Sequence, residues 1–285
     1  MPKLKQELES FLKDGVPFRI IYSTSSAFVT RSTSRICILD SSFNPPHRGH
    51  YSLAENAIHY DFPERNARKD AHDKSNRSLL LLLSVKNADK VVQPAAFADR
   101  IAMMISLADF AGQSLKVPVA LGLTSHAKFV DKATAIGKTL TEEYRSFHPT
   151  EMPLTFLMGF DTLIRVFDPK YYTPASVRDS LSSFMDLSEL FVLTRDDGLH
   201  SLDDQKRYIE NIRLGKTDTI PKEWYSKIHM VDGQKESTAI SSSALRRSIS
   251  SKEDSSIWKP YTIDAISEYI TAAGLYRPFP SGDST

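Results

Sequence analysis

Residues 35–50 read RICILDSSFNPPHRGH, and this stretch decides how the chain folds. Its first part, Arg35 to Asp40, is a short apolar run with the length of a buried strand. The next part, Ser41 to Gly49, contains two prolines and a glycine, which are typical of a shaped loop. From His50 onward, apolar residues recur at helical spacing and share one face. The stretch therefore predicts a strand, a loop and the start of a helix.

Two histidines mark the point where this helix begins. A helix N-terminus presents free backbone N–H groups and the positive end of the helix dipole, so it can hold a phosphate. His47 and His50 flank Gly49, so both imidazoles can reach an anion in front of the helix and donate hydrogen bonds to it. Either histidine alone is better explained as a surface residue of a turn, but the full string favours a phosphate site. A metal site is the weaker interpretation, because no third ligand stands at a supporting spacing.

Apolar runs alternate with amphipathic stretches along the rest of the chain. This alternation indicates the α/β class, with a doubly wound parallel sheet in a three-layer, Rossmann-like arrangement whose ligands lie at the carboxyl ends of the strands. The expected strands are Arg35 to Asp40, Leu79 to Val85, Lys116 to Leu121, Leu154 to Met158, Leu190 to Thr194 and Lys227 to Val231. The expected helices are His50 to Tyr60, Ala95 to Phe110, Ser125 to Leu140, Asp161 to Phe167, Ser176 to Met185, Asp203 to Ile212, Ser241 to Ser250 and Ile263 to Ala273.

One domain over residues 35–276 accounts for this pattern, with a helical extension at 1–34 and a tail at 277–285. The first fifteen residues mix lysines with acidic residues, which fits an amphipathic surface helix and neither a secretory signal nor a mitochondrial presequence. Residues 61–78 are polar and charge-dense without an apolar period, so we expect a surface insertion there.

Composition excludes several classes of protein. The 285 residues carry 36 Lys plus Arg against 35 Asp plus Glu, so no global field recruits nucleic acid. No apolar run reaches the roughly 18 residues of a membrane span, so no membrane partner is expected. The single cysteine, Cys37, stands between two isoleucines, which fits a buried thiol in a reducing compartment. We expect the cytoplasm, with access to the nucleus left open.

A second candidate phosphate site lies far along the chain, at Ile240-Ser241-Ser242-Ser243-Ala244-Leu245-Arg246. Serines that open a helix supply hydroxyls and free N–H groups, and Arg246 can reach the same anion from three residues beyond Ser243. An ordinary N-cap followed by surface residues explains this string equally well when it stands alone. Paired with the histidine string, the phosphate interpretation is favoured.

These two strings resemble signatures of a known superfamily. His47-Arg48-Gly49-His50 resembles the HxGH signature of nucleotidyltransferases, and the late string resembles their ISSTxxR signature with Ser243 in place of threonine. The Ser42-Phe43-Asn44-Pro45 opening resembles nicotinamide mononucleotide adenylyltransferases, of a divergent fungal type. The sequence departs from that family at Ser41, where a glycine is usual, and at Thr238, where an asparagine is usual.

The resemblance implies an ATP site with contributions from both halves of the chain. Asp161, after Gly159-Phe160, would accept hydrogen bonds from a ribose, while Gly159 makes room for it. Thr194 and Arg195 would contact adenine and a phosphate or ribose. Lys90, and less so Arg100, resemble basic positions that hold ATP phosphates. The implied ATP-binding residues are Ser42, Phe43, Asn44, Lys90, Gly159, Asp161, Thr194, Arg195, Ser241, Ser242 and Ser243.

The resemblance also implies a pocket for the mononucleotide, lined by Phe129, Lys132, Tyr171 and Tyr172. Plain structural roles remain open for these middle positions: Asp161 as a helix cap, Tyr172 and Phe129 as core, and Lys90 and Lys132 as surface charges.

The implied reaction joins ATP and nicotinamide mononucleotide to give NAD and pyrophosphate, with His47, His50 and Arg246 as the catalytic residues. Mg²⁺ would arrive with ATP, held by substrate and water, so no protein metal site is expected. One alternative is another HxGH transferase with a different acceptor. A nucleotide-binding stress or scaffold protein with weak ATPase activity is the alternative from another class. Oligomeric state and the choice between nicotinamide and nicotinic acid mononucleotide stay open.

Overall fold

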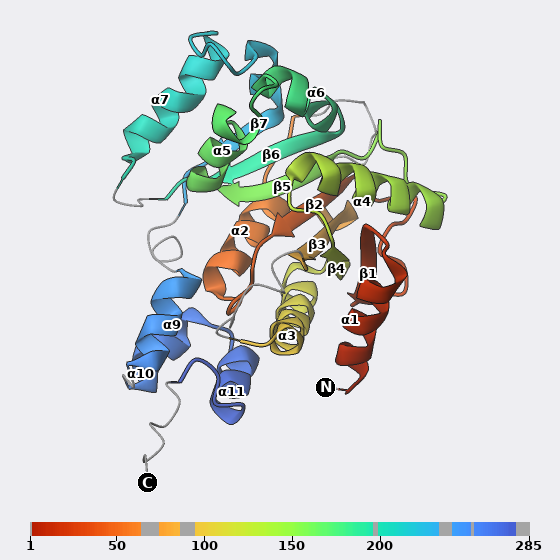
Figure 1. Cartoon of the computed structure of the whole chain (residues 1–285), viewed down its shortest axis with the longest axis vertical. Coiled ribbons are helices and arrows are strands. Elements are labelled where there is room, and N and C mark those ends of the chain that lie inside the picture. Colours follow the sequence, from red (N-terminus) through yellow and green to blue (C-terminus); the bar gives the residue numbers. More distant parts are fainter. Residues whose placement is uncertain are drawn as a thin grey trace.

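The computed structural model describes residues 2–63, 74–85, 95–195, 199–233, 241–251 and 254–277. Within these ranges one seven-stranded sheet has the order β1-β4-β3-β2-β5-β6-β7 (Figure 1). The strands are β1 (Phe18–Ser23), β2 (Arg35–Asp40), β3 (Arg77–Ser84), β4 (Val119–Thr124), β5 (Leu154–Gly159), β6 (Ser188–Leu193) and β7 (Ile228–Val231). Strands β2 to β7 are parallel, and β1 pairs antiparallel with β4. The predicted fold class is confirmed.

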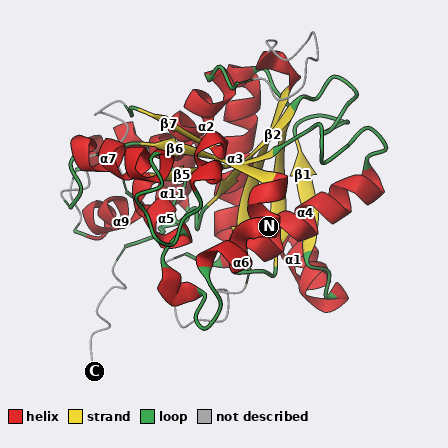
Figure 2. Ribbon diagram, turned by 90° about the horizontal axis from the view of Figure 1, so that it is seen from above, coloured by secondary structure: helices red, strands yellow, loops and turns green. Residues whose placement is uncertain are grey.

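Helices cover both faces of this sheet, which gives the three layers (Figure 2). The α-helices are α1 (Pro2–Asp14), α2 (Arg48–His59), α3 (Phe97–Leu115), α4 (Phe129–Glu143), α5 (Phe160–Val166), α6 (Val177–Leu187), α7 (Leu202–Arg213), α9 (Ser242–Ser250), α10 (Ser255–Trp258) and α11 (Asp264–Ala272). Short 3₁₀ helices are η1 (Lys74–Asn76), η2 (Pro169–Tyr171), η3 (Lys222–Lys227) and η4 (Lys259–Tyr261). None of the helices in the described ranges combines the length and the apolar character needed to cross a membrane.

The alternation of side chains along β2 explains the two layers of core. Cys37 and Leu39 pack on one face with α2, α3 and α9 to α11, whereas Ile36 and Ile38 pack on the other with α4 to α7. A strand buried on both faces needs apolar residues at every central position, which the sequence supplies. Burial raises the pKa of the Cys37 thiol to about 11, so the thiol is protonated at neutral pH.

The order of the strands places the site. From β2 the chain winds outward through β3 and β4, and it returns to wind the other way through β5, β6 and β7. β2 and β5 are neighbours, so their carboxyl ends form the switch point where doubly wound proteins bind ligands. The histidine loop follows β2 and Gly159 ends β5, so the fold brings these two segments together.

Two of the predicted segment boundaries, those at 34 and 78, are wrong. The segment at 1–34 is more than a helical extension, because β1 within it joins the sheet through β4. The insertion predicted at 61–78 extends too far toward the C-terminus, because Arg77 and Ser78 are buried at the start of β3. Arg77 Nη1 donates to the carbonyl of Ala57 at 3.1 Å, which ties β3 to the end of α2. Residues 64–73 of that insertion and the tail from 278 lie outside the described residues.

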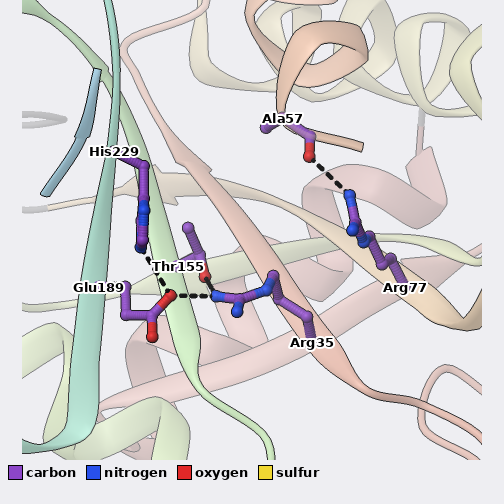
Figure 3. A network of polar contacts seen from close by, with 6 residues as sticks. All are labelled: Arg35, Ala57, Arg77, Thr155, Glu189 and His229. Atoms are coloured by element: carbon purple, nitrogen blue, oxygen red, sulfur yellow. Dashed lines mark hydrogen bonds and ion pairs between the residues drawn. The ribbon is translucent and has the colours of Figure 1, made fainter. Parts of the chain in front are cut away.

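A buried polar network lies at the opposite ends of the strands from this switch point (Figure 3). Arg35 is ion-paired with Glu189 and donates to Thr155 Oγ1 at 2.6 Å, and Glu189 also lies 3.1 Å from Nε2 of His229. These residues begin β2, β5, β6 and β7, so the network links the amino-terminal ends of four strands.

Candidate functional site

Two adjoining cavities lie at the carboxyl ends of the central strands. The larger has a volume of about 770 Å³ and the smaller about 250 Å³. Asp40, Ser41 and Thr162 line both, so they form the boundary between the cavities. Two ligands bound in these cavities would meet at this boundary.

The histidine loop caps α2 with its own side chains. His47 is the N-cap, and its Nδ1 accepts a hydrogen bond from the backbone N–H of Gly49 at 3.1 Å. Nδ1 of His50 accepts from the backbone N–H of His47 at 3.1 Å. Because a backbone N–H can only donate, Nδ1 is unprotonated in both rings and Nε2 carries the proton.

Both imidazoles are buried and neutral at physiological pH. Burial lowers the pKa of His50 to about 4. Burial, with the neighbouring His50 and Arg195, holds the pKa of His47 well below its usual range. The two rings lie 3.8 Å apart between centroids, and both side chains line the smaller cavity. Each ring of the pair therefore carries one neutral N–H, on Nε2, where the sequence had left the protonated form open.

The residues before the histidines shape the loop. Phe43 has a φ of 46°, in the left-handed region that a bulky residue rarely adopts, and its buried ring packs 4.9 Å from His50. Asn44 is buried as well, and its Oδ1 accepts from the Tyr276 hydroxyl at 2.8 Å. Both buried side chains support the loop, and neither is among the described residues that line the two cavities. Ser42 is exposed and lines the larger cavity.

The serine string lies against this loop. Ser241 is the N-cap of α9, and its hydroxyl accepts from the N–H of Ala244 at 3.1 Å. Ser242 donates to the carbonyl of Pro45 at 2.9 Å, and Arg246 Nη1 donates to the carbonyl of Asn44 at 2.6 Å. Ser241 and Ser242 line the smaller cavity, whereas the exposed Ser243 accepts from Arg246 Nη2 at 3.1 Å. Ile240 and Thr238 lie outside the described residues.

The other wall of the smaller cavity comes from the ends of β5 and β6. Gly159, Asp161, Thr194 and Arg195 all line it. A Cβ on Gly159 would lie 2.9 Å from Oδ1 of Asp161, so only glycine leaves that carboxylate in place. Gln205 of α7 is fully buried, donates to the Arg195 carbonyl at 2.6 Å and accepts from its N–H at 3.3 Å. This clamp fixes the backbone where the sequence predicts adenine contacts.

The larger cavity gathers the aromatic residues predicted for the mononucleotide. Phe129, Lys132, Tyr171 and Tyr172 all line it. Tyr171 is half exposed, while the Tyr172 hydroxyl donates to the carbonyl of Val166 at 2.6 Å. Lys132 is buried and ion-paired with Asp40, which excludes the open alternative of a surface lysine. Burial raises the pKa of Asp40, and the ammonium of Lys132 acts in the opposite direction.

Of the two basic positions after β3, Arg100 is described and Lys90 lies outside the described residues. Arg100 is buried beside the larger cavity, and its Nη1 donates to the carbonyl of Ser42 at 3.2 Å. Its Nε and Nη2 have no hydrogen-bond partner in the described part of the chain. Both atoms are also shielded from solvent, so Arg100 adds positive charge to the wall of this cavity without presenting these two donors to it.

Several of the described residues of this region were not predicted from the sequence. Asp40, Thr162 and Arg165 line the cavities, and Gln205 and Tyr276 support the loops. Arg165 Nη2 lies 3.0 Å from Oδ2 of Asp161, so this carboxylate is oriented by its own helix. Only Asp40 could have been identified from the sequence, because it ends a predicted strand, where ligands bind in this fold class.

Over the described residues, no group of three His, Cys, Asp or Glu side chains is placed to hold a metal ion.

Comparison with known proteins yields one curated relative and a set of similar structures. Over 199 residues the chain is 36% identical to a Schizosaccharomyces pombe protein named "Putative nicotinamide mononucleotide adenylyltransferase", a match that covers 70% of this chain and 69% of the relative. Two solved structures of Plasmodium falciparum nicotinic acid mononucleotide adenylyltransferase, complexed with APC and with NaAD, superpose with TM-scores of 0.50 and 0.51. They cover 85% of this chain and 97% of theirs at 13% and 14% identity, a likeness that shows the fold alone. No protein-family model matches the chain.

Proposed function

Because the chain belongs to the nicotinamide mononucleotide adenylyltransferase family, we propose that it joins ATP to nicotinamide mononucleotide, giving NAD and pyrophosphate. One observation carries this proposal beyond the family name. The histidine loop and the serine string, far apart in the sequence, are held together by Arg246 and Asn44 beside two cavities that meet at Ser41. A transferase with two nucleotide substrates needs such a pair of adjoining sites.

We assign ATP to the smaller cavity and its mouth. Asp161, oriented by Arg165, faces a ribose, and the clamped backbone at Thr194 and Arg195 faces the adenine. The N-terminus of α2 and that of α9 converge on this cavity, since His47, Ser241 and Ser242 all line it. Two helix N-termini supply the positive field that the triphosphate requires. Mg²⁺ enters as part of the substrate, Mg-ATP.

The mononucleotide occupies the larger cavity. Phe129 and Tyr171 offer ring faces for the pyridine, because aromatic side chains stack favourably on planar rings. The buried Arg100 supplies positive charge beside the 5′-phosphate, and the ammonium of Lys132, which pairs with Asp40, lies in the same cavity wall. The phosphate would then lie near the boundary with the ATP cavity.

The reaction needs no protein nucleophile. An oxygen of the mononucleotide 5′-phosphate attacks the α-phosphorus of ATP, and the bond from that phosphorus to the β-phosphate oxygen breaks to release pyrophosphate. The protein holds two mutually repelling anions in line and stabilises the charge that develops on the α-phosphate and the leaving group. His47 contributes a neutral N–H donor to the phosphates, while the single N–H of His50, on Nε2, lies 2.9 Å from Ser41 Oγ. Neutral donors remain available at all pH values above the low pKa values of these rings.

The test is direct. The protein is incubated with Mg-ATP and either nicotinamide or nicotinic acid mononucleotide, and dinucleotide and pyrophosphate are separated and quantified. The proposal requires dinucleotide and pyrophosphate in equal amounts with the nicotinamide substrate, and loss of both in His50→Ala. Dinucleotide formed from the nicotinic acid substrate alone would contradict the assigned acceptor. ADP and free phosphate without dinucleotide would instead support the alternative of a nucleotide-binding protein with ATPase activity.

A further inference from the structure

Ser41 stands where the family has glycine, and the structure gives its hydroxyl a partner. Ser41 Oγ lies 2.9 Å from Nε2 of His50. Nδ1 of His50 is an acceptor, because it faces the backbone N–H of His47. Nε2 therefore carries the proton and donates to Ser41 Oγ.

The hydroxyl proton of Ser41 is consequently directed elsewhere. An oxygen that accepts from His50 keeps its own O–H as a donor. Across the described ranges, no protein atom other than His50 is in hydrogen-bond contact with this hydroxyl. Ser41 is half-buried and lines both cavities, whereas the buried His50 lines the smaller one alone. The hydroxyl thus lies at the boundary where the two phosphates must meet.

We propose that Ser41 is a further catalytic residue, whose hydroxyl donates a hydrogen bond to the phosphoryl group in transfer while it accepts one from His50. Two hydrogen bonds, from the His47 N–H to His50 and from His50 to Ser41, hold the Ser41 hydroxyl in a fixed direction before substrate binds. A donor fixed in advance stabilises developing charge without reorganisation, which is the main source of such catalysis. This inference rests on the proposed function and adds a residue that the family signature lacks.

The alternative is that Ser41 only satisfies the buried His50 ring. Its hydroxyl would then be replaceable, and glycine, the usual residue of the family, would serve as well or better. Removing the hydroxyl should lower kcat if Ser41 is catalytic and should leave kcat unchanged if Ser41 only satisfies the His50 ring.

The experiment compares Ser41→Ala, Ser41→Gly and Ser41→Thr with the wild type in the dinucleotide assay. We expect kcat to fall at least tenfold in Ser41→Ala and Ser41→Gly, with the KM for ATP within threefold, and to recover in Ser41→Thr, which keeps the hydroxyl. Ser34→Ala is the matched control, because Ser34 precedes β2 as Ser41 follows it and its hydroxyl donates to the Asn76 carbonyl at 3.2 Å. Its kcat should match that of the wild type.

Several outcomes would overturn the inference. A smaller loss of kcat in Ser41→Ala or Ser41→Gly, or a faster Ser41→Gly enzyme, would show that the hydroxyl is not used. The ¹⁵N spectrum of the His50 ring provides the second readout. We expect the same tautomer in Ser41→Ala as in the wild type, and a changed tautomer would mean that Ser41 acts only by positioning His50. A wild-type protein that forms no dinucleotide would refute the proposed function itself, which separates the two failures.

Discussion

Arg246 donates a hydrogen bond from Nη1 to the backbone carbonyl of Asn44 at 2.6 Å, across 202 residues of sequence. This contact joins the two candidate phosphate-binding strings into one site. The same guanidinium holds Ser243 through Nη2 at 3.1 Å, so it connects the start of α9 to the loop that precedes α2. The side chain is therefore already oriented before any substrate binds.

Removing this connection should damage catalysis more than folding. We expect Arg246→Ala to lower kcat/KM by about a hundredfold, because Arg246 lines neither cavity and holds the loop, and misplacing a site by about 1 Å has roughly that cost. Arg247→Ala is the matched control, since the neighbouring Arg247 is exposed on the same helix. Steady-state kinetics with both variants provide the measurement. Equal activities of the two would contradict the role given to Arg246.

Lys132 provides a test of the larger cavity. We expect Lys132→Met to raise the KM for the mononucleotide at least tenfold, because the ammonium is lost from the cavity wall and Asp40 is left without its partner, while the KM for ATP stays within threefold. Lys138→Met, on the exposed side of α4 where Lys138 lies 3.9 Å from Glu142, is the control. If Lys132→Met instead raises the KM for ATP alone, the assignment of the two cavities is reversed.

The neutral state of His50 has a consequence for stability. Its pKa is about 4 in the folded chain and about 6.5 when unfolded, so the unfolded state binds more protons between these values. The free energy of unfolding should therefore fall as the pH drops from about 6.5 toward 4. In His50→Gln this fall should be shallower, by up to about 1.4 kcal/mol per pH unit. Urea titrations of both proteins at several pH values measure it, and identical slopes would disprove that His50 is buried in its neutral form.

The network at the other end of the sheet affects stability without touching the site (Figure 3). Glu189→Gln removes the charge that pairs with Arg35, leaving a buried guanidinium uncompensated. We expect the free energy of unfolding to fall by about 3–5 kcal/mol, the usual cost of breaking a buried pair. The kcat of the folded fraction should not change, since the network lies at the opposite ends of the strands. A marked loss of kcat at full folding would show that the two ends are coupled.

The sequence predicted the parallel core of the fold well, because strands such as β2 are buried on both faces and carry an unbroken apolar run. β1 escaped prediction since Phe18 is its one fully buried residue, and its place depends on pairing with β4, about a hundred residues away. The start of β4 was placed too early, at Lys116, which caps α3 in a left-handed conformation with a φ of 55°. Local pattern does not reveal that a charged residue ends one element instead of beginning the next.

The same difference between local pattern and tertiary pairing separates the site residues that were predicted from those that were not. The histidine and serine strings could be identified because each is a contiguous motif whose residues are neighbours in the sequence. The pairing of Asp40 with Lys132 and of Asn44 with Tyr276 depends on tertiary packing, because the partners are separated by 92 and 232 positions in the sequence. The contact of Ser41 with His50 spans only 9 residues, yet it became visible only with the loop geometry.

Transfer of an adenylyl group is followed by tracing the α-phosphate of ATP. The protein is supplied with Mg-ATP labelled at the α-phosphorus, together with nicotinamide mononucleotide, and the label is traced by chromatography. We expect the label to appear in NAD, with one pyrophosphate released for each NAD formed. Label that remains in ADP, or is recovered as AMP with no dinucleotide, would contradict it.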